Sequence, residues 1–259
     1  GVHMKKLAGA YRHELLRIFH SYRIYICIIA YVIICLYMEH TPGISKISSR
    51  TVFEGLSNIA GFNNMNKIPV IIAAIPMATS FCDDISNNYF NPYVLRCGKK
   101  NYIISKLTTC FFSSFIVSFT GLSVYSIISG AINGLGIRQI HEYRVFHDIA
   151  YGKYPIAAVI IFIFLFSMVS GVYAVMGMAL SAAVPNRFVA VTSAFFISMF
   201  VENVLDFLPT SISLFEIQKG NKAFFGMNSG YILLLSCMVC LGYILLAAWV
   251  FKHFAERRI

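Results

Sequence analysis

Long apolar segments, separated by shorter polar ones, constrain this sequence more than any other feature. About 20 apolar residues, rising 1.5 Å each as a helix, cross the roughly 30 Å hydrocarbon core of a bilayer. The sequence therefore predicts an all-α membrane protein with six transmembrane helices in one transmembrane domain, residues 22–259. The predicted spans cover approximately residues 22–38, 67–81, 102–128, 154–184, 188–205 and 230–251.

Composition supports lipid as the solvent of this chain. Hydrophobic residues make up 58% of it and charged residues only 12%, whereas a soluble domain is about 25% charged. The predicted span 67–81 is the shortest and contains Pro69 and Pro76. We expect Pro76 to kink this helix, and the span to gain length from residues 61–66 or from the loop that follows it.

The distribution of charge predicts the orientation. One side of the predicted bundle collects 13 of the 21 Lys and Arg residues but only four acidic residues. By the positive-inside rule this side is cytoplasmic. With six spans, the chain is then a multi-pass protein of the cell (cytoplasmic) membrane, and both termini lie in the cytoplasm. The 13 basic residues are Lys5, Lys6, Arg12, Arg17, Arg23, Arg96, Lys99, Lys100, Lys106, Arg187, Lys252, Arg257 and Arg258.

Two further segments suit the membrane boundary. Residues 1–3 read as an expression scar, and residues 4–21 predict an amphipathic helix lying in the interface, with a solvated cytoplasmic helix as the alternative. Its apolar face consists of Leu7, Tyr11, Leu15, Ile18, Phe19 and Tyr22. Residues 206–229 are too apolar for an ordinary outer loop, and they predict a re-entrant-like segment between spans five and six.

The segment between spans two and three carries the most specific pattern. Two acids come first, then an aromatic pair, a short apolar turn and a basic cluster. A Tyr-x-x-x-Lys step then leads into span three. In order, these residues are Asp83, Asp84, Tyr89, Phe90, Tyr93, Val94, Leu95, Arg96, Lys99, Lys100, Tyr102 and Lys106.

This pattern resembles the first cytoplasmic loop of ABC-2-type transporter permeases, the six-helix membrane subunits of exporters for peptides, bacteriocins and drugs. The matching positions are Asp84, Asn87-Asn88, Val94-Leu95, Arg96, Tyr102 and Lys106, and the glycine expected near Asn88 is absent. The topology outlined above is similar to that of the family over its whole length.

The resemblance implies that this loop is a coupling helix docking on a separate ATPase chain. Tyr89, Phe90, Tyr93 and Leu95 would anchor it, and Asp83, Asp84, Arg96, Lys99 and Lys100 would set its register. The alternative is that these charges only hold the topology. The resemblance also implies a dimer with a second permease copy or homologue, and hydrophobic or amphipathic cargo such as membrane-active peptides.

The sequence contains few candidates for nucleotide-binding, catalytic or metal-binding residues. Gly98-Lys99 and Gly152-Lys153 lack the rest of a P-loop, so ATP and Mg²⁺ are expected only on the partner ATPase. We expect no catalytic residue, no metal site and no nucleic-acid partner. Glu202, Asp206, Phe207 and Phe215 are candidates for a gate or cargo contact near the outer end of span five. An ion-coupled secondary transporter and an intramembrane enzyme remain as alternative functions.

Overall fold

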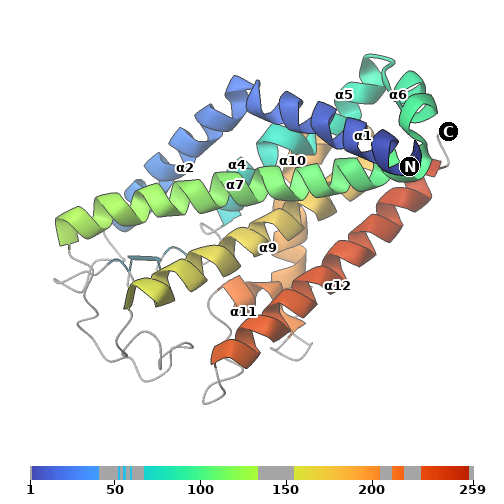
Figure 1. Cartoon of the computed structure of the whole chain (residues 1–259). Helices are drawn as coiled ribbons and strands as arrows, with labels where there is room; N and C mark the ends of the chain where they lie inside the picture. Colours follow the sequence, from blue (N-terminus) through green and yellow to red (C-terminus); the bar gives the residue numbers. More distant parts are fainter. Residues whose placement is uncertain are drawn as a thin grey trace.

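The computed structural model describes residues 2–40, 52, 55–56, 59, 67–133, 155–204, 212–218 and 229–256. Within these ranges the regular structure is helical and no strand occurs. The helices, shown in Figure 1, are α1 (Val2–Phe19), α2 (Tyr22–His40), α4 (Lys67–Ala78), α5 (Ser80–Ser86), α6 (Phe90–Cys97), α7 (Lys99–Asn133), α9 (Pro155–Ala183), α10 (Arg187–Val204), α11 (Leu214–Gln218) and α12 (Ser229–Glu256).

Five helical segments are long and apolar enough to cross a bilayer. They are Tyr22–Glu39, Lys67–Ser86, Lys99–Ile132, Ile156–Ala183 and Ser229–Glu256. This confirms the prediction of a helical, membrane-embedded protein. The predicted span 188–205 coincides with α10, whose apolar part, Arg187–Val201, is shorter than the other five. Six spans therefore stay a prediction.

The second span is interrupted where its proline predicts. Pro76 lies inside α4, and α4 ends two residues later, before α5 begins at Ser80. Proline has no N–H to donate and its ring crowds the preceding turn, which disfavours an uninterrupted helix. Together α4 and α5 form the 20-residue candidate span. This candidate span extends past residue 81 into the segment predicted as the following loop, whereas residues 61–66 lie outside the described ranges.

Helix α9 forms the centre of the bundle. It packs against α4, α7, α10, α11 and α12, and 72% of its apolar window is buried, against 22% for α12. A small residue allows α7 to approach closely, because a Cβ on Gly171 would lie 2.7 Å from the Phe111 ring. At the same crossing the Ser114 hydroxyl donates to the Ser170 carbonyl at 3.1 Å. Small residues and interhelical hydrogen bonds are typical of helix contacts in membranes.

Helix α1 is separate from α2 and packs against α6 and α7 (Figure 1). Its buried face consists of Ala10, Glu14 and Ile18. Leu15 and Phe19, from the face predicted to meet headgroups, are exposed instead. Exposure of these apolar side chains is compatible with lipid contact, and the interfacial location stays a prediction.

The start of α1 and the end of α12 lie at the same end of the bundle as α6 (Figure 1). Phe251 near the end of α12 packs edge-on against Phe81 of α5, with ring centroids 5.1 Å apart. Within the predicted re-entrant segment 206–229, the structure describes residues 212–218. They include the short helix α11, which packs on α9 and α10.

Candidate functional site

The segment predicted as a cytoplasmic loop, residues 82–106, is mostly helical. It contains the end of α5, all of α6 and the first two turns of α7. The chain reverses at Asn88 and Gly98, whose φ angles are 57° and 86°. Asparagine tolerates a left-handed backbone better than most residues other than glycine. Asn88 therefore takes a backbone conformation that glycine also adopts readily.

A buried carboxylate connects this segment to the rest of the bundle. Asp84 Oδ2 lies 2.7 Å from Lys106 Nζ and accepts a hydrogen bond from the Tyr102 hydroxyl at 2.9 Å. Its other oxygen, Oδ1, accepts from Arg17 Nη1 at 2.7 Å. Three positions of the sequence motif, the acid, the aromatic residue and the lysine, thus meet at one point.

Lys106 also binds a second acid from another helix. Its Nζ lies 2.9 Å from Glu14 Oε1, and both side chains are fully buried. Burying an isolated charge is very costly, so such groups persist as ions only when they are paired. Lys106 therefore joins α1, α5 and α7 through two carboxylates.

A third acid extends the cluster toward the surface. Asp83 Oδ1 lies 2.8 Å from Arg187 Nε, while Arg17 Nη2 and Arg23 Nη1 approach Oδ2 at 3.6 and 3.7 Å. We call the whole set the charged junction. It consists of Glu14, Arg17, Arg23, Asp83, Asp84, Lys106 and Arg187. It links α1, α2, α5, α7 and α10 at one end of the bundle.

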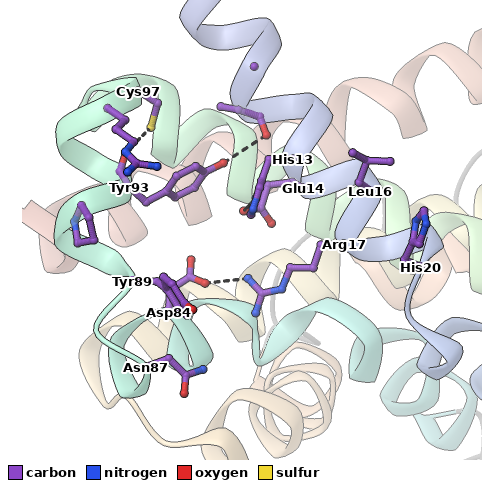
Figure 2. A pocket seen from close by; sticks show the side chains of 14 residues that line it. His13, Glu14, Leu16, Arg17, His20, Asp84, Asn87, Tyr89, Tyr93 and Cys97 are labelled. Carbon is purple, nitrogen blue, oxygen red and sulfur yellow. Dashed lines mark hydrogen bonds and ion pairs between the residues drawn. The ribbon is translucent and has the colours of Figure 1, made fainter.

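Arg17 stays charged within this junction. Burial alone would lower the pKa of its guanidinium, but the charge of Asp84 and the hydrogen bond to it outweigh that effect. Glu14 and Asp83 add in the same direction, so the pKa of Arg17 lies above its ordinary value. The ion pair between Arg17 and Asp84, drawn in Figure 2, therefore persists at neutral pH.

A groove of about 1090 Å³ lies between α1 on one side and α5 and α6 on the other. Figure 2 shows Tyr93 reaching across it toward α1, where its hydroxyl donates to the Ala10 carbonyl at 3.2 Å. Burial, reinforced by the nearby Glu14, raises the pKa of Tyr93, so the hydroxyl keeps its proton. The lining residues are Gly9, Ala10, His13, Glu14, Leu16, Arg17, His20, Asp84, Asn87, Tyr89, Pro92, Tyr93, Arg96 and Cys97.

Aromatic rings of α5 and α7 pack against α6. The Tyr102 ring meets Phe90 and Tyr93 edge-on, with both centroid distances 5.4 Å. Phe90 also packs edge-on against Phe81 at 5.7 Å. These contacts, with the Tyr93 hydrogen bond, fix the position of α6 on α1 and α7.

The candidate coupling residues fall into two groups. Asp83, Asp84 and Phe90 are buried and Tyr93 is half-buried. Their contacts described above hold the segment to the rest of this chain. The other group points outward: Tyr89 is 65% exposed and Leu95 84% exposed, and Arg96, Lys99 and Lys100 are exposed around them. Exposed apolar and aromatic side chains, with basic residues close to them in the sequence, are therefore present at α6.

Most of the second candidate site, the predicted gate or cargo contact, lies outside the residues that the structure describes. Glu202 lies on α10, but its side chain is outside the description, as are Asp206 and Phe207. Phe215 is half-buried on α11. The gate hypothesis stays a prediction. In the part of the chain that is described, no group of His, Cys, Asp and Glu has the arrangement of a metal site.

Sequence reasoning missed the role of two residues on α1. Glu14 and Arg17 contributed only to the count of charges, whereas both belong to the charged junction. One signal was available, because Glu14 is the only acidic residue before Glu39. An isolated acid among basic residues next to a membrane span is a candidate for a specific ion pair.

Comparisons with protein-family models and with curated proteins find no match to this sequence. The class of protein is therefore defined by the fold and the site themselves. The chain is a helical membrane protein with several apolar helices of spanning length. Its distinguishing feature is a short helix, α6, which follows the charged junction along the chain and is held at one end of the bundle by aromatic packing and the Tyr93 hydrogen bond.

Proposed function

We propose that this chain is the membrane-spanning permease subunit of an ATP-driven ABC exporter, and that a separate ATPase chain docks on α6. The observation that carries the proposal is the convergence of Asp84, Tyr102 and Lys106, which the sequence motif separates by up to 22 residues. The contacts among these three side chains give a physical reason for their presence in the motif. They fix α5, and with it the segment that leads to α6, against the start of span three.

The exposed part of α6 has the properties of a docking element. Leu95 on α6 and Tyr89, which directly precedes α6, offer an exposed apolar and an exposed aromatic side chain. A few well-packed anchors, tyrosine prominent among them, supply most of the free energy of an interface. Arg96, Lys99 and Lys100 are exposed and follow Leu95 in the sequence. They favour an acidic surface on the partner and help to set its register.

The charged junction is the means by which movement of α6 would reach the bundle. Force applied to α6 would pass along the chain to α5, then through Asp84 and Lys106 to α7, and from Lys106 through Glu14 to α1. Asp83 and Arg187 connect the same segment to α10. ATP and Mg²⁺ act on the partner chain, so this chain contributes the path through the membrane and no catalytic group.

The remaining features of the proposal follow from charge and composition. The protein lies in the cell membrane with both termini and α6 in the cytoplasm, and it works with a second permease copy or homologue. Cargo is hydrophobic or amphipathic, most simply a membrane-active peptide such as a toxin or bacteriocin. The apolar character of the helices motivates this choice.

Co-purification tests the proposal. Leu95→Ala removes the most exposed anchor without touching the charged junction. We expect it to weaken binding of a separately encoded P-loop ATPase about 30-fold, from the roughly 2 kcal/mol of an interface hot spot. Val184→Ala, an exposed apolar residue between α9 and α10, serves as the control and should bind normally.

Two results would count against the exporter. Equal binding of the ATPase by Leu95→Ala and the parent protein would show that α6 is not the docking element. Transport by the purified chain in vesicles without any ATPase would favour the ion-coupled secondary transporter instead.

A further inference from the structure

Two arginines from different helices converge on Asp83 at the surface of the charged junction. Arg187, the first residue of α10, places its Nε 2.8 Å from Asp83 Oδ1. Arg23, in the first turn of α2, approaches the other oxygen at 3.7 Å. One carboxylate thus lies within ion-pair distance of both guanidinium groups, although α2 and α10 lie far apart in the sequence.

These guanidinium groups keep unused donors. An arginine carries five N–H donors, and within the described ranges Arg187 uses its contacts to Asp83 and to Ser86 Oγ at 3.3 Å. The approach of Arg23 is too long for a hydrogen bond. The two side chains are 54% and 62% exposed. Asp83 therefore faces two accessible cations and leaves a local excess of positive charge.

Exposed aromatic side chains flank the pair. Tyr22 and Tyr25 stand beside Arg23 on α2, and Phe188 follows Arg187 on α10, all exposed at the protein surface. Aromatic rings of this kind gather at the headgroup level of a bilayer. Both arginines also stand at the start of apolar helices. In a bilayer spanned by these helices, the donors would lie at the level of lipid phosphates, next to surface that suits the glycerol and upper acyl chains.

We propose that Arg23 and Arg187 bind the phosphate of an anionic phospholipid, such as phosphatidylglycerol. Paired guanidinium forks match phosphate oxygens in geometry and charge. The net positive charge around Asp83 favours a lipid with a net negative headgroup over a zwitterionic one. Ser21 and Asn186 already accept backbone N–H hydrogen bonds at the N-terminal ends of α2 and α10. The phosphate would therefore bind to the guanidinium N–H donors themselves.

Lipid titration followed by native mass spectrometry tests this site. Phosphatidylglycerol, phosphatidylcholine and inorganic phosphate are added separately to the purified full chain. We expect tight retention of phosphatidylglycerol, and about 30-fold weaker retention in the Arg23→Gln/Arg187→Gln variant, from about 1 kcal/mol per basic residue. The control variant Arg12→Gln/Arg96→Gln removes the same charge from two other exposed arginines and should retain the lipid normally.

Four outcomes would overturn the proposal. An equal loss in both double variants would show bulk attraction only, and equal retention of phosphatidylcholine would remove the specificity for anionic lipid. Inorganic phosphate binding as tightly as the lipid would indicate a free-anion site. The single variant Arg23→Gln controls for misfolding of the double variant, because it leaves the shorter contact between Arg187 and Asp83 intact. It should still weaken retention about fivefold, and no change would also refute the site.

Discussion

Lys106 is the residue whose removal should cost the bundle most. It is fully buried and pairs with Glu14 at 2.9 Å and with Asp84 at 2.7 Å. In Lys106→Met, Asp84 would keep Arg17 and Tyr102. Among the described residues, the one contact left to Glu14 within ion-pair distance would be His13 Nδ1 at 3.8 Å, and an imidazole is charged only when protonated. Breaking a buried pair costs about 3–5 kcal/mol.

That loss is large against the total stability of a protein, which is about 5–15 kcal/mol. Methionine matches the length of the lysine stem, so little of the loss would come from a cavity. We therefore expect the free energy of unfolding of Lys106→Met, measured by equilibrium denaturation in detergent, to fall by about 3–5 kcal/mol.

Lys252→Met is the matched control. Lys252 is 53% exposed and pairs with Glu256 at 3.9 Å, and such surface pairs contribute about 0–1 kcal/mol. The double variant Glu14→Gln/Lys106→Met should recover part of the stability, because it leaves no unpaired charge at Glu14. Equal losses in Lys106→Met and Lys252→Met would refute the view that buried ion pairs hold α1 and α5 to α7.

Two further substitutions test the packing and the hydrogen bonding. Gly171→Ala should lower the thermal unfolding midpoint, because its Cβ would collide with a ring of α7 at a cost of about 1–3 kcal/mol. Gly242→Ala, where a Cβ meets nothing, should keep or raise the midpoint. Tyr102→Phe should cost about 1.5–3 kcal/mol of unfolding free energy, because Asp84 loses a hydrogen bond. Tyr231→Phe, at an exposed ring, should change it by less than about 0.5 kcal/mol, and equal effects at both tyrosines would contradict the assignment.

The helical bundle could be predicted because it depends on local properties. Apolar runs of spanning length produced the helices α2, α7, α9 and α12 close to their predicted limits, and Pro76 marked the interruption of the second span. The hydropathy of α10 is less decisive, because its apolar part is short. Periodicity also predicted a helix over residues 4–21, but not the face that it buries. That face includes Glu14, whose burial depends on Lys106, 92 positions away in the sequence.

The candidate site could be predicted only in part, for a related reason. The motif indicated which residues of the segment matter, but not that Asp84 and Phe90 point inward while Leu95 points outward. For Phe90 and Leu95 that division depends on the helical phase of α6, which the turns at Asn88 and Gly98 fix. The partners Arg17 and Arg187 come from helices remote in sequence. No local pattern encodes such long-range pairing.

The central claim is that an ATPase docks on α6, and crosslinking from Leu95 tests it most directly. A photo-crosslinking amino acid is placed at position 95 in cells, and the captured chain is identified by mass spectrometry. The account predicts a covalent product with a separate polypeptide that contains a P-loop, and none from the exposed position Tyr231. Capture of no P-loop protein at position 95, or equal capture at both positions, would contradict it.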